Sequence, residues 1–184
     1  MIALYLLGLV ALWAVLSKLL WKAWRRIRQN AGKNQLVVDV AFGVFAIAWL
    51  AVSFWYGGGR KFYYDAEVKR LCAIDGGIKV YETITLPADR FNSYGNIGVQ
   101  IKGNEKPTDE YYYDFKDKYL KAGNPSILRN VSQLIRRNDG KVLGEAIRYV
   151  RGGGDLYGPW MGSSFDCPSN LSLNLEKSIF KKEQ

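Results

Sequence analysis

The stretch LVVDVAFGVFAIAWLAVSFWY, Leu36–Tyr56, decides the fold class, because it is long and apolar enough to form a membrane-spanning helix. A hydrocarbon core about 30 Å thick needs roughly 20 apolar residues of helix. The only charged residue in this stretch is Asp39, close to its start. Trp55 and Tyr56 end it, and such rings are typical of a membrane–water interface. We therefore predict a transmembrane helix over residues 36–56.

An earlier apolar segment, Ile2–Trp24, predicts a first transmembrane helix over residues 1–24. Lys18 and Lys22 interrupt it only near its end, where lysine side chains can reach the headgroups. A cleaved signal peptide would need basic residues before the apolar run and a small-residue cleavage site after it. A buried helix of a water-soluble protein is the other alternative. Because two such runs follow each other closely, we favour a transmembrane hairpin.

Basic residues between the two segments set the expected orientation. Residues 25–35 hold four of them, Arg25, Arg26, Arg28 and Lys33. Basic residues in short loops stay on the cytoplasmic side, although Arg60 and Lys61 after the second segment act in the opposite sense. We predict a basic cytoplasmic loop over residues 25–35 and a multi-pass protein of a bacterial inner (plasma) membrane, with both termini extracytoplasmic.

Asp39 is the only acidic residue in either segment. In an antiparallel hairpin it would lie near the same membrane surface as Lys18 and Lys22, which predicts an ion pair at the membrane interface. An acid within a membrane segment is also a candidate for a transport role, but two helices with one acid are too little for a transporter. Membrane lipids are therefore the first expected partner.

The formal net charge of +9 does not indicate nucleic-acid binding. Residues 1–59 hold six basic residues and one acid, so more than half of the excess lies in the hairpin, where topology and anionic lipids explain it. The chain has no histidine, which excludes a Ser-His-Asp triad and histidine-ligated metals. No spacing resembles an EF-hand, a phosphate loop or a pair of catalytic carboxylates. We expect no catalytic residue, cofactor or metal.

The two cysteines, Cys72 and Cys167, both lie behind the hairpin and outside any Cys-x-x-Cys pattern. If this part of the chain is outside the cytoplasm, the oxidising compartment favours a disulfide between them. Two buried free thiols in a cytoplasmic domain are the alternative. We predict the disulfide, which would close nearly the whole domain into one loop.

The residues behind the hairpin are enough for one compact domain. Three glycines predict a flexible glycine-rich joint over residues 57–61, and the domain follows over residues 62–176. Phe62–Ile74 reads as a short helix. Asp139-Gly140, between two apolar runs, predicts a β-hairpin, with Gly144 as a bulge in the return strand.

Further strands are expected at Ile78–Leu86, which alternates well, at Asn96–Lys102, at Lys106–Leu120 and around Leu171–Leu175. Gly152–Pro168 reads as a loop, and residues 177–184 as a charged, frayed tail. The predicted fold class is a membrane-anchored α+β protein. A two-helix transmembrane hairpin precedes a small, β-rich, mostly antiparallel extracytoplasmic domain with one short helix, closed by a disulfide.

Two aromatic groups form the candidate partner surface. Tyr157, Trp160 and Phe165 lie on the Gly-Pro-rich loop, and aromatic side chains recur at binding hot spots. Burial of Trp160 and Phe165 in the small core, beside the disulfide, is the alternative. The run Tyr111, Tyr112, Tyr113 must point to both faces of a strand, so at least one ring should be exposed.

These features predict a non-catalytic accessory or regulatory protein. It would dock on a larger integral membrane or envelope assembly through its helices and its aromatic-rich periplasmic domain. A membrane protein that excludes phage DNA or a toxin needs the same parts and is the alternative. An envelope enzyme or a sensor of cell-wall sugars, using the tyrosines and acids of the domain, is a second alternative.

Overall fold

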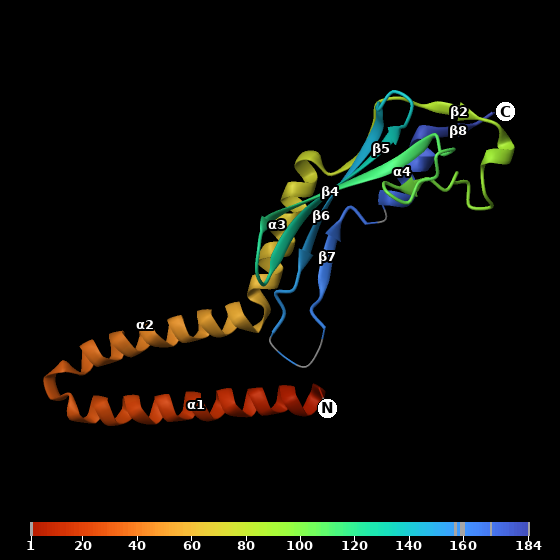
Figure 1. Ribbon diagram of the computed structural model, residues 1–184. Coiled ribbons are helices and arrows are strands. Elements are labelled where there is room, and N and C mark those ends of the chain that lie inside the picture. The colour runs from red at the N-terminus through yellow and green to blue at the C-terminus, as the bar shows by residue number, and fades with distance from the viewer. Residues whose placement is uncertain (1, 157, 159–160, 170, 184) are drawn as a thin grey trace. The chain divides into compact units, whose positions relative to one another are not determined.

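The computed structural model describes residues 2–156, 158, 161–169 and 171–183, apart from the side chains of residues 171–174. The chain divides into two compact units. One unit comprises Met1–Arg60 and Asp155–Gly162, and the other comprises Lys61–Gly154 and Ser163–Gln184. Figure 1 shows the helices of the first unit and the sheet of the second.

The first unit is a pair of antiparallel helices, α1 (Ile2–Asn30) and α2 (Gln35–Phe54), joined by the short 3-10 helix η1 (Gly32–Asn34). Both helices are long and apolar enough to cross a membrane, by length and composition. They touch through side chains along their length. Trp24 stacks on Phe42 with ring centroids 5.0 Å apart, and the Trp13 indole donates a hydrogen bond of 3.1 Å to Ser53. Neither helix contains a buried residue, so the apolar side chains of both helices stay accessible from outside the pair.

The helix pair ends later than predicted at one boundary and is kinked at the other. α1 continues to Asn30, so most of the predicted loop over residues 25–35 is helical, because arginine and glutamine are good helix formers. At the predicted joint over residues 57–61 the helical path is kinked, and the division between the two units falls after Arg60. A turn of π-helix, η2 (Trp55–Gly59), follows α2 directly, and only Gly58, with φ 142°, departs from helical geometry. That backbone conformation is one that glycine adopts without steric cost.

The second unit is an α+β domain. It contains the helices and strands α3 (Arg60–Asp75), β1 (Gly77–Val80), β2 (Ile84–Leu86), η3 (Ala88–Arg90), β3 (Gln100–Ile101), β4 (Tyr111–Lys121), β5 (Ser126–Arg136), β6 (Val142–Gly152), β7 (Ser164–Cys167), α4 (Leu171–Ile179) and β8 (Phe180–Lys182). The predicted first helix of the domain and the β5–β6 hairpin at Asp139-Gly140 are confirmed. The domain holds two helices, α3 and α4, rather than the single predicted one.

The main sheet has the strand order β1-β6-β5-β4-β3, with β7 beside the same edge of β6 as β1. The three long strands β4, β5 and β6 lie side by side and antiparallel (Figure 1). The short strand β3 pairs in parallel with the start of β4, at Tyr112 and Tyr113 only. A separate two-stranded parallel sheet joins β2 to β8. The prediction of a mostly antiparallel, β-rich domain is therefore confirmed.

Two apolar clusters form the core, one on each face of the sheet. Val68 and Cys72 of α3 pack on Ile127 and Val131 of β5 and on their neighbours in β6. Leu134, also on β5, belongs to the other cluster, which α4 covers through Leu175, Ile179 and the following Phe180. Side chains alternate between the faces along a strand, and this alternation places Val131 and Leu134 on opposite sides. Each helix thus covers one face over part of its length.

A β-bulge shifts the pairing register of β5 and β6 near the turn that joins them. Leu134 pairs with Gly144 and Ile135 with Val142, so Leu143 is the extra residue, one position from the predicted Gly144. The Leu143 carbonyl accepts hydrogen bonds from both Tyr81 and Glu82. This contact ends β1, and the strand predicted over residues 78–86 is divided into β1 and β2. Gly144 itself is required for space, because a Cβ there would lie 2.8 Å from the Lys79 carbonyl.

The C-terminal end differs from its prediction. The strand expected around residues 171–175 is the helix α4, and the expected frayed tail contributes β8. Leu175 and Ile179, four residues apart, are fully buried, as is typical of one face of a helix. Phe180 is buried too, and β8 pairs with β2 at Ile84, Thr85 and Leu86. A run of three alternating leucines was too short to distinguish a strand from a helix.

Candidate functional site

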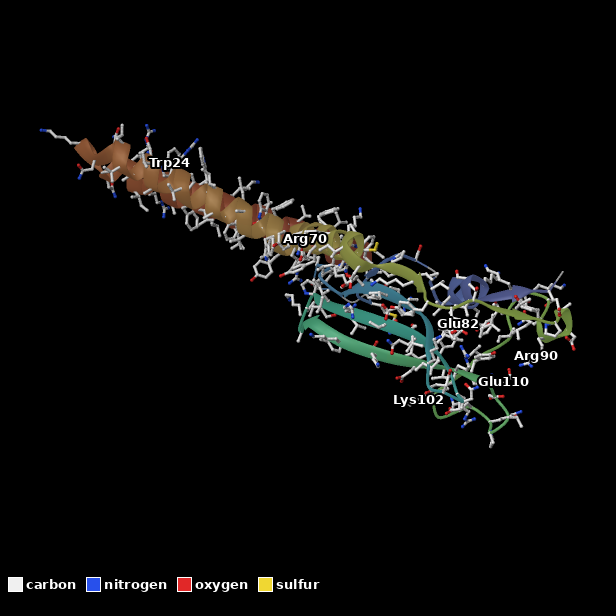
Figure 2. The ribbon with its side chains drawn as sticks, turned by 90° about the horizontal axis from the view of Figure 1, so that it is seen from above. Trp24, Arg70, Glu82, Arg90, Lys102 and Glu110 are labelled. Carbon is white, nitrogen blue, oxygen red and sulfur yellow. A yellow bond between two sulfur atoms is a disulfide. The ribbon has the colours of Figure 1, made fainter. Side chains whose placement is uncertain are left out.

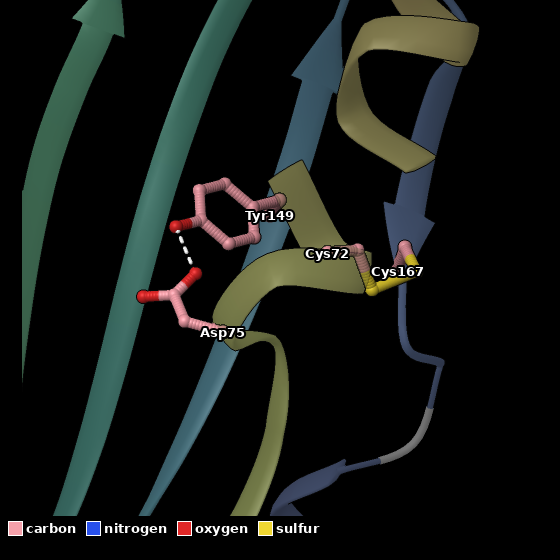
Figure 3. Close-up of a disulfide and its surroundings, with 4 residues drawn as sticks. All are labelled: Cys72, Asp75, Tyr149 and Cys167. Carbon is pink, nitrogen blue, oxygen red and sulfur yellow. Dashed lines mark hydrogen bonds between the residues drawn. A yellow bond between two sulfur atoms is a disulfide. The ribbon is translucent and has the colours of Figure 1, made fainter. Parts of the chain in front are cut away.

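The predicted disulfide between Cys72 and Cys167 is present, with a sulfur–sulfur distance of 2.05 Å. Cys72 lies on α3, and Cys167 ends β7, whose backbone pairs with Tyr149 of β6 (Figure 3). The residues read as one loop over 152–168 therefore include a strand at their far end. The bond fastens β7 to the helix that covers this face of the sheet.

A hydrogen-bonded group of three side chains lies beside the disulfide. The Tyr149 hydroxyl donates to Asp75 over 2.5 Å, and Arg129 donates to both Tyr149 (3.1 Å) and Asp75 (2.9 Å) (Figure 3 shows the first bond). The hydrogen bond from Tyr149 is the main reason that the pKa of Asp75 is lowered, and Arg129 adds to it. Burial raises the pKa of Tyr149. An ionised carboxylate and a neutral phenol fit a structural contact at the end of α3.

A buried arginine holds the two ends of the following loop together. The Arg151 side chain is only 1% exposed, and its Nε lies 2.5 Å from the Asp65 carboxylate of α3. Its guanidinium also donates to the carbonyls of Gly153 and Ser163. The Gly153 amide also donates a hydrogen bond to the Ser163 carbonyl, so the two ends of this loop lie side by side. Sequence reasoning missed this arginine, and Arg148-Tyr-Val-Arg151 in a strand gives no signal that the second arginine is buried.

The loop residues predicted as a partner surface are only partly described. Tyr157 and Trp160 lie outside the described residues. Phe165 is half-buried against the α3 cluster, and the Lys69 ammonium lies 5.6 Å from its ring centroid. For Phe165 the alternative of a packing role is therefore the better description.

The three consecutive tyrosines do not form an exposed surface. Tyr113 is buried in the α4 cluster, and Tyr111 packs edge-on against Phe180 with centroids 4.9 Å apart. Tyr112 is half-buried. No ring of the three is in the exposed class: α4 and β8 cover the face that carries Tyr111 and Tyr113, and Tyr112, on the other face, pairs with Gln100 of β3. Burial raises the pKa of the Tyr113 hydroxyl, so this phenol stays neutral.

Farther along the same strand, three large apolar or aromatic side chains are exposed. Phe115 is 42% exposed, Tyr119 65% and Leu120 43%. From Asp114 to Lys121, the outer edge of β4 pairs with no strand among the described residues, because β3 ends beside Tyr113. We call Phe115, Lys116, Lys118, Tyr119 and Leu120 the β4 surface. Lysines that alternate with aromatic residues are a sequence signal of an edge strand, and this signal was available.

Among the described residues, the sheet face next to the β4 surface packs against neither α3 nor α4. Tyr119 pairs with Leu128, and Leu128 with Val150, which places these three side chains in one row. The row lies on the face opposite α3, beyond the residues that contact α4. Leu128 and Val150 are half-buried. An incoming chain could therefore meet both open backbone groups at the edge and apolar side chains on the face.

Ion pairs at the far end of the domain are structural. Glu82 accepts from Arg136 and, over 2.6 Å, from Lys141. The Lys141 hydrogen bond is the main cause of the lowered pKa of Glu82. Arg90 and Glu110 form a further pair at 3.5 Å, and Figure 2 labels Glu82, Arg90 and Glu110 at this end of the domain. The described part of the chain has no group of three acids or cysteines placed to hold a metal ion.

In the helix pair, Asp39 has other partners than the predicted Lys18 and Lys22. The Arg28 guanidinium lies 3.1 Å from its carboxylate, and the Trp24 indole donates to it over 3.2 Å. The reason is the length of α1. Its continuation to Asn30 moves the turn away from the lysines, so Asp39, near the start of α2, faces the last turns of α1. Trp24 is labelled in Figure 2.

Comparison of the chain with protein-family models, with curated proteins and with solved structures finds no match.

Proposed function

We propose that the protein is anchored in a bacterial inner membrane by α1 and α2, with the turn between them in the cytoplasm. The supporting features are the two long apolar helices and the basic residues near their turn. The disulfide supports an extracytoplasmic domain, because such bonds persist in oxidising compartments. Both termini would then lie outside the cytoplasm.

The domain, in this proposal, is a non-catalytic docking module of an accessory or regulatory protein. The single observation that carries the proposal is the open edge of β4 from Asp114 to Lys121, with Phe115, Tyr119 and Leu120 exposed beside it. An exposed strand edge accepts an extended segment of another chain through backbone hydrogen bonds, and side-chain contacts give the specificity. The partner would be a larger integral membrane or envelope protein.

Charge on the edge limits the strand registers that a partner can adopt. Antiparallel self-pairing centred on Asp117 places Asp117 opposite itself and Lys116 opposite Lys118. Self-pairing centred on Lys118 places Lys118 opposite itself, whereas centring on Lys116 also places Asp114 opposite Lys118. Like charges directly opposite each other destabilise a strand pair. Lys116 and Lys118 therefore disfavour the self-paired registers centred on Asp117 and Lys118, and they favour a partner strand that carries acidic and apolar side chains.

The test is photo-crosslinking in living cells, with a photoreactive amino acid at position 119. Tyr94, a loop tyrosine that is 79% exposed, provides the matched control position. We expect one discrete crosslinked product from position 119 and none of that size from position 94. Lys118→Glu should weaken this product, because it places an acid opposite the acidic partner. Equal products from both positions, or no product from position 119, would contradict the docking role.

A further inference from the structure

Two adjoining hollows lie on the helix pair, and their chemistry differs. One has a volume of about 430 Å³ and is lined by Trp21, Trp24, Arg25, Arg28, Gln29 and Gln35. The other is a groove of about 260 Å³ between the helices, lined mainly by apolar side chains that include Trp13, Leu20, Phe45 and Trp49. Trp21 lines both hollows, so the basic one borders the apolar one.

The basic hollow is built around two arginines stacked on indole rings. The Arg25 guanidinium lies 5.5 Å from the Trp21 centroid, and Arg28 lies 5.5 Å from Trp24. Such stacking holds a guanidinium in place while its N–H groups stay available. Arg28 is also paired with Asp39, the only acid in residues 1–59. Among the described residues, Arg25 has no acidic partner, so it is the cation available to an external anion.

We propose that these hollows together bind one anionic phospholipid. The phosphate would accept hydrogen bonds from Arg25, with the Gln29 and Gln35 amides beside it, and one acyl chain would occupy the groove between α1 and α2. Both halves of the ligand are needed, because a free phosphate leaves the groove unfilled and a neutral lipid leaves Arg25 without an anion. Basic pockets at the cytoplasmic end of membrane helices are known to bind such headgroups. This inference rests on the proposed membrane insertion.

The test measures lipid retention on the full-length chain, purified in a mild detergent, by native mass spectrometry. The probes are phosphatidylglycerol and a diacylglycerol with identical acyl chains, which lacks the phosphate, and glycerol 3-phosphate as a competitor. We expect one bound phosphatidylglycerol per chain and little diacylglycerol. Arg25→Gln should weaken retention about tenfold, which corresponds to the loss of one charge-assisted hydrogen bond.

Arg26→Gln is the matched control, because it removes the same charge from the next residue, which does not line the hollow. Retention by this variant should equal that of the unchanged protein. Equal retention of both lipids, equal loss in the two arginine variants, or full displacement by glycerol 3-phosphate would each overturn the proposal.

The failure of this inference is distinguishable from the failure of the proposed function. A chain that inserts in the membrane and gives the position-119 crosslink, but retains the two lipids equally, contradicts only the lipid site. A chain that does not insert contradicts both.

Discussion

The helix pair and the β domain of this chain place their apolar side chains in opposite ways. α1 and α2 bury none of their residues, and large apolar side chains such as Leu4, Val10 and Ile47 are mostly exposed. The domain buries Leu134, Leu143 and their neighbours in clusters on both faces of one sheet. One region is apolar on the outside and the other on the inside.

This difference indicates what stabilises each region. The domain removes its own apolar surface from water, which is the main favourable contribution to folding. The helix pair does not, and a lipid bilayer is the covering that we propose for its apolar surface, because the two helices are long enough to span one. The same substitution should therefore have different effects in the two regions.

Loss of the disulfide should have the largest effect on the domain. The bond joins residues separated by 95 positions, and the chain-entropy model gives about 4–5 kcal/mol for a loop of this size. We predict that Cys72→Ser and Cys167→Ser lower the free energy of unfolding equally, and that the double variant is no worse than either. Thermal and denaturant unfolding in detergent would measure this. Additive losses would show that the two residues do not act as one unit.

Matched leucine substitutions test the comparison directly. Leu134→Ala should cost about 2–5 kcal/mol, because it leaves a cavity at a residue that is fully buried between β5 and α4. Leu12→Ala, at a residue that is 57% exposed on α1, should change the unfolding free energy by about 0.5 kcal/mol or less. Urea unfolding in detergent, followed through circular dichroism of the whole chain, gives both values. Equal losses would mean that Leu12 also packs inside a protein core.

A smaller, pH-dependent effect is expected at Asp75. Its pKa in the folded domain is below the ordinary 3.8, so its contribution is present above that pH and is lost as the pH falls through the folded pKa. Tyr149→Phe removes the main hydrogen bond to Asp75 and should lower the free energy of unfolding by about 1–2 kcal/mol near neutral pH. The pKa of Asp75 then lies closer to its ordinary value, so the stability of this variant should fall less as the pH is lowered. Unfolding curves between neutral and strongly acidic pH would show this.

Tyr119→Phe is the control for that change, because it removes a hydroxyl from an exposed ring of the same domain. Its stability should follow the unchanged protein at every pH. If Tyr149→Phe and Tyr119→Phe behaved alike, the hydrogen bond to Asp75 would contribute nothing measurable.

Sequence reasoning predicted the parts of the fold that depend on strong local patterns. The apolar run at residues 36–56, the Asp139-Gly140 turn and the pairing of the two cysteines were all visible in the sequence. It failed where short patterns are ambiguous. Three alternating leucines at the C-terminus fit a strand and a helix equally well.

The candidate site was predicted less well, because its location depends on tertiary pairing. Tyr113 and Phe115 have similar local sequence, but only Tyr113 packs against Leu134, Leu175 and their neighbours. The two-residue length of β3, which leaves the rest of the edge open, follows from no local signal. Arg28 replaced the predicted lysines as the partner of Asp39 because the end of α1 had been placed too early.

The central claim is that α1 and α2 cross a bacterial inner membrane and leave the β domain outside the cytoplasm. Alkaline phosphatase, which is active only outside the cytoplasm, should be fused after Gln184, and the same enzyme inserted at Gly32 in the turn between the helices provides the matched comparison. The account predicts high activity from the fusion after Gln184 and low activity from the insertion at Gly32, with equal amounts of both proteins. High activity at Gly32 and low activity after Gln184 would contradict it.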